Sequence, residues 1–369
     1  MRKEEGAAEK LAEFVRYAIG REFPEIDGTA PLATQAIEML RAFARRQAET
    51  VTAWVRVGYV QGNMNSDNCL LSGRTMDYGP FGFVEEYSEL WTPFTSDMEA
   101  KFGFERQPLA AQVRNAPPRL HATSPPPQPP PPQPLSPLTH SRRAQVNVMT
   151  LGRALIPLFD GDGREEAIDA LQSIVQEEYP AVLKASMDEM RRAKLGIAVW
   201  DDGADALWKA LRPLMAKSAV DFVIFFRQLA AITNADAAAA AAAGLSDDAA
   251  AADVLLERVS PSFYSEESAR EAQGEWREWF AAYARRLAAD GRPDGERSAE
   301  IRRTSPKYTP REWMLAEAYR AAEKSDFGPL EELAALFRAP FDEHPELEAK
   351  YYRRAPHGQA KVGGLSYFS

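Results

Sequence analysis

Residues 58–83 read GYVQGNMNSDNCLLSGRTMDYGPFGF, and they form the most informative stretch of the chain. Two short apolar runs, 59–60 and 69–71, are typical of strands, and the run 72–74 has the composition of a tight turn. The polar residues between the two apolar runs predict a loop. The pattern therefore predicts a small β-hairpin whose loops carry the functional side chains.

Three oxygen-bearing side chains, Asp67, Asn68 and Asp77, lie at the two ends of this predicted connection. Each of them alone is more often a turn or capping residue. Together, at this spacing, they favour a site for a divalent cation bound to phosphates, because such cations take oxygen ligands from carboxylates, amides and phosphate groups.

The composition is that of a soluble globular protein. The chain has 369 residues, 45% hydrophobic and 27% charged, which is enough to bury one large core or two ordinary ones. The net charge of −10, without a stripe of Lys and Arg, argues against a nucleic-acid surface. The most apolar run, 219–226, is too short to span a membrane, and the N-terminus resembles neither a signal peptide nor a transit peptide. We therefore expect neither a nucleic acid nor a membrane as a partner.

The only cysteine is Cys69, so the chain cannot form an internal disulfide. Its place beside an acidic motif favours a small buried apolar residue over a reactive thiol. The sequence contains no P-loop and no GxGxxG, CxxC, HExxH or GxSxG motif, which leaves residues 58–83 as the candidate site.

Most of the remaining chain has the apolar spacing of amphipathic helices. Residues 8–21 and 32–57 predict two helices, of which the first ends before Pro24 and the second at Gly58. The expected core face of the first is formed by Leu11, Phe14, Val15 and Ile19. Further helical faces are expected at 154–158, 168–175, 183–190, 207–214, 276–287, 314–322 and 330–337, and the run 221–229 must be buried. The predicted fold class is mainly α with a small β-hairpin at the active site.

Two segments have low complexity. The proline-rich residues 115–145 cannot bury a core and predict a disordered insertion, with a ligand for a PxxP-binding domain as the alternative. The alanine-rich residues at about 235–252 form helix readily but have little to pack, so we expect a poorly ordered insertion there. The three acids Asp201, Asp202 and Asp205 predict an acidic linker.

Residues 61–68, QGNMNSDN, match the kinase catalytic loop H-R-D-x-x-x-x-N in length and in the final asparagine, and residues 77–79 take the place of D-F-G. Asn63 then occupies the position of the kinase base, where an amide cannot accept a proton. This combination resembles the selenoprotein O family of pseudokinases, which act as protein adenylyltransferases. The family pattern is similar to H-G-V-M-N-T-D-N followed by D-Y-G-P-F-G-F. The chain matches it at Gly62, Met64, Asn65, Asp67, Asn68 and the whole of 77–83.

The resemblance covers nearly all of the chain outside the proline and alanine segments. It implies a protein-kinase-like C-lobe over residues 1–114 and, beyond the insertion 115–145, a helical C-terminal region over 146–369. Further similar positions are Asp97, Arg106-Gln107-Pro108, Met190-Arg191, Lys194-Leu195-Gly196, Asp221, Phe226-Arg227, Pro306-Lys307-Tyr308 and Pro340-Phe341-Asp342-Glu343.

The resemblance also implies roles for the central residues. Asp67 is the candidate proton acceptor, Asn68 and Asp77 are candidate ligands of Mg²⁺ or Mn²⁺, and Asp77 would also lie close to ATP. AMP would pass from ATP to a Ser, Thr or Tyr hydroxyl of a protein substrate. A full-length eukaryotic member would be mitochondrial, and because no targeting segment is visible here, the cytoplasm is the alternative.

The chain departs from the family pattern in several places. The histidine of the pattern is Gln61, its valine is Asn63, and the family's C-terminal cysteine or selenocysteine is replaced within residues 366–369, so redox control there is not expected. The N-terminal lobe, with its glycine-rich cover, phosphate-binding lysine and glutamate partner, is not found upstream of Asp67. We therefore expect a truncated form whose activity stays open. The alternative is a non-catalytic helical interaction protein derived from a pseudokinase.

Overall fold

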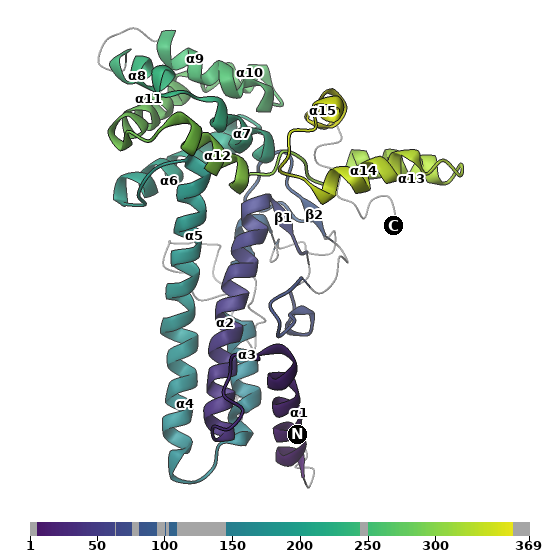
Figure 1. Ribbon diagram of the computed structural model, residues 1–369. Coiled ribbons are helices and arrows are strands. Elements are labelled where there is room, and N and C mark those ends of the chain that lie inside the picture. The colour runs from purple at the N-terminus through teal and green to yellow at the C-terminus, as the bar shows by residue number, and fades with distance from the viewer. Residues whose placement is uncertain are drawn as a thin grey trace, which may run out of the picture. The chain divides into compact units, whose positions relative to one another are not determined.

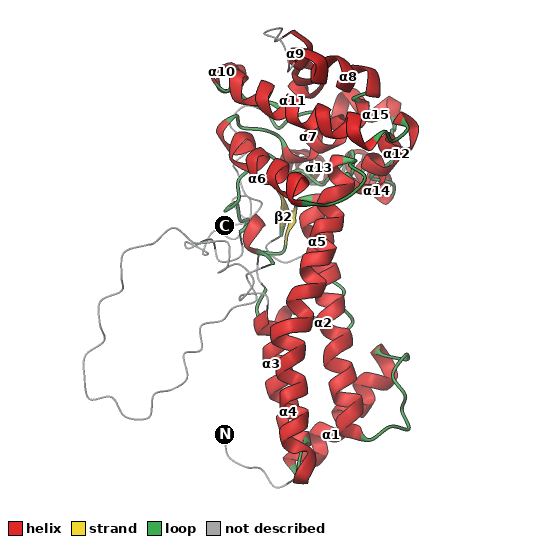
Figure 2. Ribbon diagram, turned by 90° about the vertical axis from the view of Figure 1, so that its left-hand side faces the viewer, coloured by secondary structure: helices red, strands yellow, loops and turns green. Residues whose placement is uncertain are grey.

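A computed structural model describes residues 6–62, 64–75, 81–93, 100, 103–108, 145–243 and 250–356. Within these ranges the chain is mainly helical and has one small antiparallel sheet, which confirms the predicted secondary-structure class (Figures 1 and 2). No helix in the described part of the chain is long and apolar enough to cross a membrane. The proline-rich segment lies outside the described residues.

The residues divide into two compact units. The first is drawn from Met1–Val51, Met64–Asp77 and Arg106–Lys184, and the second from Thr52–Asn63, Tyr78–Glu105 and Ala185–Ser369. The division into 1–114, 115–145 and 146–369 stays a prediction.

The first unit is a set of helices that lie side by side in both views (Figures 1 and 2). A π-helical turn follows α4, and Arg41 holds it through two bonds to Glu178, with Nε 2.7 Å from Oε2 and Nη2 3.1 Å from Oε1. The elements that contribute to this unit are α1 (Ala7–Glu22), α2 (Leu32–Val57), η1 (Ser66–Asn68), α3 (Gln145–Leu155), η4 (Ile156–Leu158), η5 (Gly161–Gly163), α4 (Arg164–Ser173), the π turn η6 (Ile174–Glu178) and α5 (Tyr179–Leu195).

Helix α1 confirms its predicted end and corrects its predicted face. The helix stops at Glu22, one residue before Phe23-Pro24, because the residue that precedes a proline avoids the helical region. Its buried residues are Val15, Ala18 and Ile19, whereas Phe14 is 59% exposed. The prediction that Phe14 faces the core is therefore wrong, since the buried stripe is narrower than the apolar one.

The second unit is built around aromatic residues of α7 and α11, as the sequence predicted. Trp276 donates from Nε1 to Ser218 Oγ at 2.9 Å, and Tyr283 donates from its hydroxyl to the Leu195 carbonyl at 2.7 Å, so the buried polar tips have partners. The helices of this unit are α6 (Asp202–Lys217), α7 (Phe222–Gln228), α8 (Asn234–Ala243), α9 (Ala250–Val259), α10 (Glu266–Glu271), α11 (Gln273–Asp290), α12 (Asp294–Thr304), α13 (Glu312–Ala322), α14 (Gly328–Arg338) and α15 (Pro345–Tyr351). The 3₁₀ turns are η2 (Phe104–Arg106), η7 (Leu229–Ala231) and η8 (Ser260–Ser262). The last residue of η2, Arg106, is assigned to the first unit.

The strand partners in the sheet differ from those predicted from the sequence. Strand β1 (Tyr59–Val60) runs antiparallel to β2 (Gly82–Phe83), with Tyr59 opposite Phe83 and Val60 opposite Gly82. The predicted strand at 69–71 is wrong, because only one isolated bridge, between Cys69 and Thr75, forms there. The turn predicted between these two residues is present, but its flanks are too short to extend into strands.

The alanine-rich segment is helical where it is described, which corrects the expectation of a poorly ordered insertion. Helix α8 packs against α11, and its Ala237 and Ala240 are fully buried (Figure 1). Small side chains allow two helices to approach closely, so these alanines do have a surface to pack against. Residues 244–249 lie outside the described part of the chain.

One other prediction is corrected, and two helices were not predicted individually. Asp201 is the N-cap of α6 and accepts from the Ala204 amide at 2.9 Å, so Asp202 and Asp205 belong to a helix and not to a linker. Helix α12 was missed because its sequence has almost no apolar stripe. Helix α15 was missed because it is only seven residues long.

Candidate active site

The predicted catalytic residues lie on a short arch of the first unit, residues 64–69. At its centre the 3₁₀ turn η1 carries Asp67, which is exposed, and Asn68, which is half-buried. The Asn68 amide closes the turn by donating to the Asn65 carbonyl at 2.9 Å. Met64, at the start of the arch, is 2% exposed. The arch therefore begins in the core and presents an acid and an amide at its outer edge.

One residue of α3 contacts both ends of this arch. The side-chain nitrogen of Asn147 donates to the Met64 carbonyl at 3.2 Å and to Cys69 Sγ at 3.0 Å. Asn147 is itself buried, with 5% of its surface exposed. A buried amide needs hydrogen-bond partners, and here the arch supplies them.

Helix α2 holds the chain that follows the arch. Gln47 donates from Nε2 to the Leu70 carbonyl at 3.4 Å, and the Thr50 hydroxyl donates to the Gly73 carbonyl. Gly73 has a φ of +72°, and a Cβ at this position would lie 2.5 Å from Cβ of Arg46. Only glycine combines this backbone conformation with such a close approach to α2.

An isolated antiparallel bridge places Thr75 beside Cys69, the last residue of the arch. Burial, with a smaller contribution from the Asp67 charge, raises the pKa of Cys69 to about 12. The thiol is therefore protonated at neutral pH, which disfavours a nucleophile, but the expected buried apolar role is not met, because Cys69 is half-buried and its sulfur accepts a hydrogen bond.

Of the three predicted site residues, the structure describes two. Asp67 and Asn68 are neighbours on η1, while Asp77 lies outside the described residues, as do Asn63 and Asp97. Only Met76 separates Thr75 from Asp77 in the sequence.

Gln61, which stands where the family pattern has histidine, has a structural role in this chain. Gln61 is 4% exposed and accepts a hydrogen bond from the Tyr59 hydroxyl through Oε1. An amide held in this way cannot supply the proton chemistry of a histidine.

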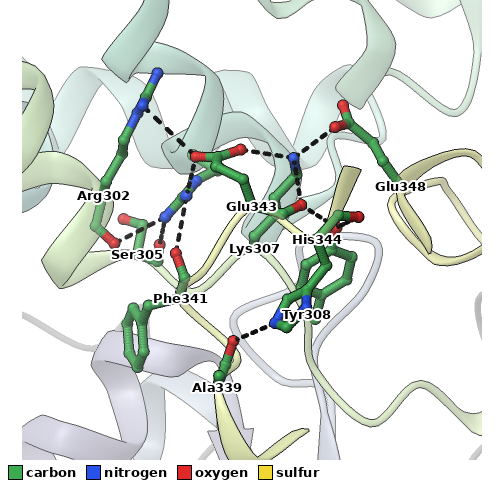
Figure 3. Close-up of polar contacts among 10 residues, drawn as sticks. Arg302, Ser305, Lys307, Tyr308, Ala339, Phe341, Glu343, His344 and Glu348 are labelled. Carbon is green, nitrogen blue, oxygen red and sulfur yellow. Dashed lines mark hydrogen bonds and ion pairs between the residues drawn. The ribbon is translucent and has the colours of Figure 1, made fainter. Parts of the chain in front are cut away.

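Several charged residues at family-matching positions form a cluster in the second unit, in which the cations are buried and the carboxylates are exposed (Figure 3). Arg227, with 5% of its side chain exposed, donates to four oxygens. These are the Arg302 carbonyl at 2.8 Å, the Ser305 carbonyl at 3.1 Å, the Phe341 carbonyl at 3.0 Å and Glu343 Oε1 at 2.6 Å. The guanidinium thus ties three chain segments together.

Lys307 completes this cluster. Its ammonium lies 2.7 Å from Glu343 Oε2 and 2.8 Å from Glu348 Oε2, and the Tyr308 hydroxyl donates to the Glu343 carbonyl at 2.7 Å (Figure 3). Because the buried cations Lys307 and Arg227 each pair with a carboxylate of the chain, these contacts stabilise the fold.

Sequence reasoning missed Asn147, Gln47 and Thr50. Asn147 lies between two valines in the sequence QVNVM, and a polar amide at a buried helical position is a signal that it bonds to something specific. What it bonds to could not be inferred, because its partners are 83 and 78 residues away.

Comparisons with known proteins show the family of this chain. Residues 3–117 and 139–338 match the family model described as protein adenylyltransferase SelO. The chain is 30% identical over 365 residues to the protein nucleotidyltransferase YdiU of Azoarcus sp. (strain BH72), an alignment that covers 99% of this chain and 59% of the relative. It is 31% identical over 321 residues to the protein of the same name from Burkholderia multivorans, covering 85% and 51%, and 28% identical over 356 residues to that of Flavobacterium johnsoniae, covering 96% and 57%. The chain thus spans less than two-thirds of the length of each relative. Since the family model matches most of its residues, the chain belongs to the protein adenylyltransferase SelO family.

Proposed function

We propose that this chain carries the metal- and phosphate-binding part of a protein adenylyltransferase, which transfers AMP from ATP to a Ser, Thr or Tyr hydroxyl of a protein. Membership of the family supports the transfer of a nucleotidyl group, and the relatives are named protein nucleotidyltransferases. The observation that carries the proposal is the arch 64–69, which presents Asp67 and Asn68 together and is anchored at both ends by α3. We extend the proposal to a kinase-like C-lobe, with which a helical body and a small sheet are consistent.

The proposed reaction is a substitution at the α-phosphorus of ATP. The substrate hydroxyl oxygen forms a bond to this phosphorus, the bond to the bridging oxygen of pyrophosphate breaks, and the hydroxyl proton passes to the carboxylate of Asp67. Asp67 is exposed, so a hydroxyl group of another protein can come within hydrogen-bonding distance of it.

We propose Asn68 and Asp77 as ligands of Mg²⁺ or Mn²⁺. The donor chemistry fits, because these ions prefer oxygen and are usually held by one or two side chains together with phosphates and water. Among the residues that the structure describes, no group of three or more His, Cys, Asp or Glu side chains could hold a metal. In the proposed site, ATP and water would supply the ligands other than Asn68 and Asp77. When bound, the ion would neutralise the charge that develops on the phosphates.

The first test follows the fate of the phosphates. The chain is incubated with candidate proteins and ATP labelled at the α- or the γ-phosphate, in the presence of Mg²⁺ or Mn²⁺. We expect α-label to become attached to protein and to be lost with Asp67→Asn and with Asp77→Asn. Asp162→Asn, an exposed aspartate of η5 in the same unit, is the matched control and should keep the label. Transfer of γ-label alone contradicts the proposal.

The second test measures nucleotide binding without turnover. A ligand that binds only the folded state stabilises it by about 2.7 kcal/mol at one hundred times its Kd. We therefore expect Mg²⁺ with ATP to raise the melting temperature of the chain, and less so in Asp77→Asn. The absence of both label and stabilisation would favour the alternative, a non-catalytic helical interaction protein.

A further inference from the structure

We propose that Asn147 is a positioning residue: its side-chain amide fixes both ends of the arch 64–69 and thereby sets where Asp67 and Asn68 lie. The consequence for metal binding rests on the function proposed above, but the anchoring itself can be tested independently of it.

A single side-chain nitrogen of Asn147 contacts both ends of the arch. The amide nitrogen of Asn147 carries two hydrogens and has two acceptors, the Met64 carbonyl at 3.2 Å and Cys69 Sγ at 3.0 Å. Because both acceptors lie within hydrogen-bonding distance of the same nitrogen, they can be no more than about 6 Å apart. Four residues, with Asp67 and Asn68 among them, span this gap. A single amide therefore closes the base of the arch.

The place of Asn147 in the fold suits this task. It lies on α3, so its Cα is held by a regular helix, which is a more precise support than a loop. Gln47 and Thr50 restrain the chain too, but their acceptors, the carbonyls of Leu70 and Gly73, both follow the arch. Asn147 reaches Met64, three residues before Asp67, as well as Cys69, directly after Asn68.

Removing the two donors should destabilise the arch more than it destabilises the helices of the same unit. Without them, the Met64 carbonyl and the Cys69 sulfur are no longer drawn together, and the turn between them can open. Residues that orient a metal ligand without touching the metal typically change metal affinity or activity by about 10–100-fold when they are replaced.

The test uses Asn147→Leu, which keeps the size and branching of the side chain and removes both donors. Thr150→Ala, exposed on the same helix, is the matched control. Hydrogen–deuterium exchange of the full chain compares residues 64–75 with α1 and α4. In Asn147→Leu we expect exchange at 64–75 to be faster by about tenfold or more, with α1 and α4 unchanged, whereas Thr150→Ala should behave like the wild type. Unchanged exchange at 64–75, or an equal increase in all three regions, overturns the proposal.

Asn147→Gln separates hydrogen bonding from space filling. It restores two donors on a longer stem, so it should protect residues 64–75 better than Asn147→Leu does. If leucine protects them as well as or better than glutamine, the donors are not what positions the arch.

The second measurement is the affinity for Mn²⁺ in the presence of ATP, followed by the spin resonance of free Mn²⁺. We expect Asn147→Leu to weaken it by about 10–100-fold and Thr150→Ala to leave it unchanged. If the wild type binds Mn²⁺ with ATP and Asn147→Leu binds it equally well, the positioning role is overturned and the proposed function stands. If the wild type does not bind, the proposed function fails, and the exchange of residues 64–75 still decides whether Asn147 holds the arch.

Discussion

Arg311 holds the carboxylate of Asp221 with both terminal guanidinium nitrogens, Nη1 at 2.6 Å from Oδ2 and Nη2 at 3.1 Å from Oδ1. The same Nη1 lies 3.0 Å from Oε2 of Glu85, and the Tyr264 hydroxyl donates to Asp221 Oδ2 at 3.1 Å. All three charged residues are buried, with exposures of 2% for Arg311, 0% for Asp221 and 4% for Glu85. Two carboxylates in the core of the second unit therefore share one guanidinium.

Replacing Arg311 by methionine should destabilise the protein strongly. The change leaves two buried carboxylates without their cation, and breaking a buried ion pair from one side typically costs about 3–5 kcal/mol. Unfolding by urea, followed by circular dichroism, measures this cost. Arg303→Met, at an exposed position of α12, is the control and should stay within about 0.5 kcal/mol of the wild type. Equal stability of the two variants would contradict the role given to Arg311.

The pH dependence of stability should carry the signature of Glu85. Burial, opposed by Arg311 and reinforced by the charge of Asp221, raises the pKa of Glu85 from 4.5 to about 7. The native state then keeps a proton that the unfolded state has released, so the free energy of unfolding falls as the pH rises from 4.5 to 7. The slope from one such group is at most about 1.4 kcal/mol per pH unit.

Glu85→Gln should remove this part of the slope, because glutamine does not titrate. Denaturant unfolding at several pH values between 4.5 and 7 compares the variant with the wild type. Glu278→Gln, an exposed position of α11, should leave the profile unchanged. A Glu85→Gln profile parallel to that of the wild type would show that Glu85 is already ionised across this range.

On α8, a larger side chain should be tolerated at an exposed alanine but should destabilise the protein at a buried one. Ala240 is fully buried in a helix that packs on α11, whereas Ala239 is exposed. Ala240→Leu should cost about 1–3 kcal/mol, because extra methylene groups in a packed interface force neighbours apart. Ala239→Leu should change stability by less than about 0.5 kcal/mol. Thermal unfolding of both variants checks this, and equal melting temperatures would mean that α8 is not packed as described.

Replacing Gly73 by alanine should reduce the stability more than replacing Gly161, a glycine of similar backbone conformation. Gly73 has a φ of +72° and Gly161 a φ of +64°, but a Cβ at Gly73 would lie 2.5 Å from Arg46 Cβ, while nothing lies within 4 Å of one at Gly161. Gly161→Ala should cost about 1–2 kcal/mol for the left-handed backbone alone. Gly73→Ala should cost clearly more, because α2 must also move. Urea unfolding of the two variants measures the difference, and a cost at Gly73 no larger than at Gly161 would contradict the close approach to α2.

Much of this protein could be predicted from local sequence. The apolar spacing predicted a helix over 32–57, and α2 has these bounds. The aromatic face of α11 and the buried run of α7 were predicted correctly as well, because helix periodicity and burial of large apolar side chains depend on residues that are near one another in the chain. The pair Asp67 and Asn68 was proposed from a short motif, and its role stays a prediction.

Only the tertiary structure decided which distant residues each of these segments contacts. Tyr59–Val60 pairs with Gly82–Phe83 and not with the nearer run 69–71, and the alanines of α8 become core only because α11 covers them. Asn147 meets Met64 from a position 83 residues further along the chain. Local sequence determines which conformation a segment prefers. The identity of its distant partner depends on how the whole chain packs, because a contact across a long loop forms only where the packing of the intervening helices brings the two ends together.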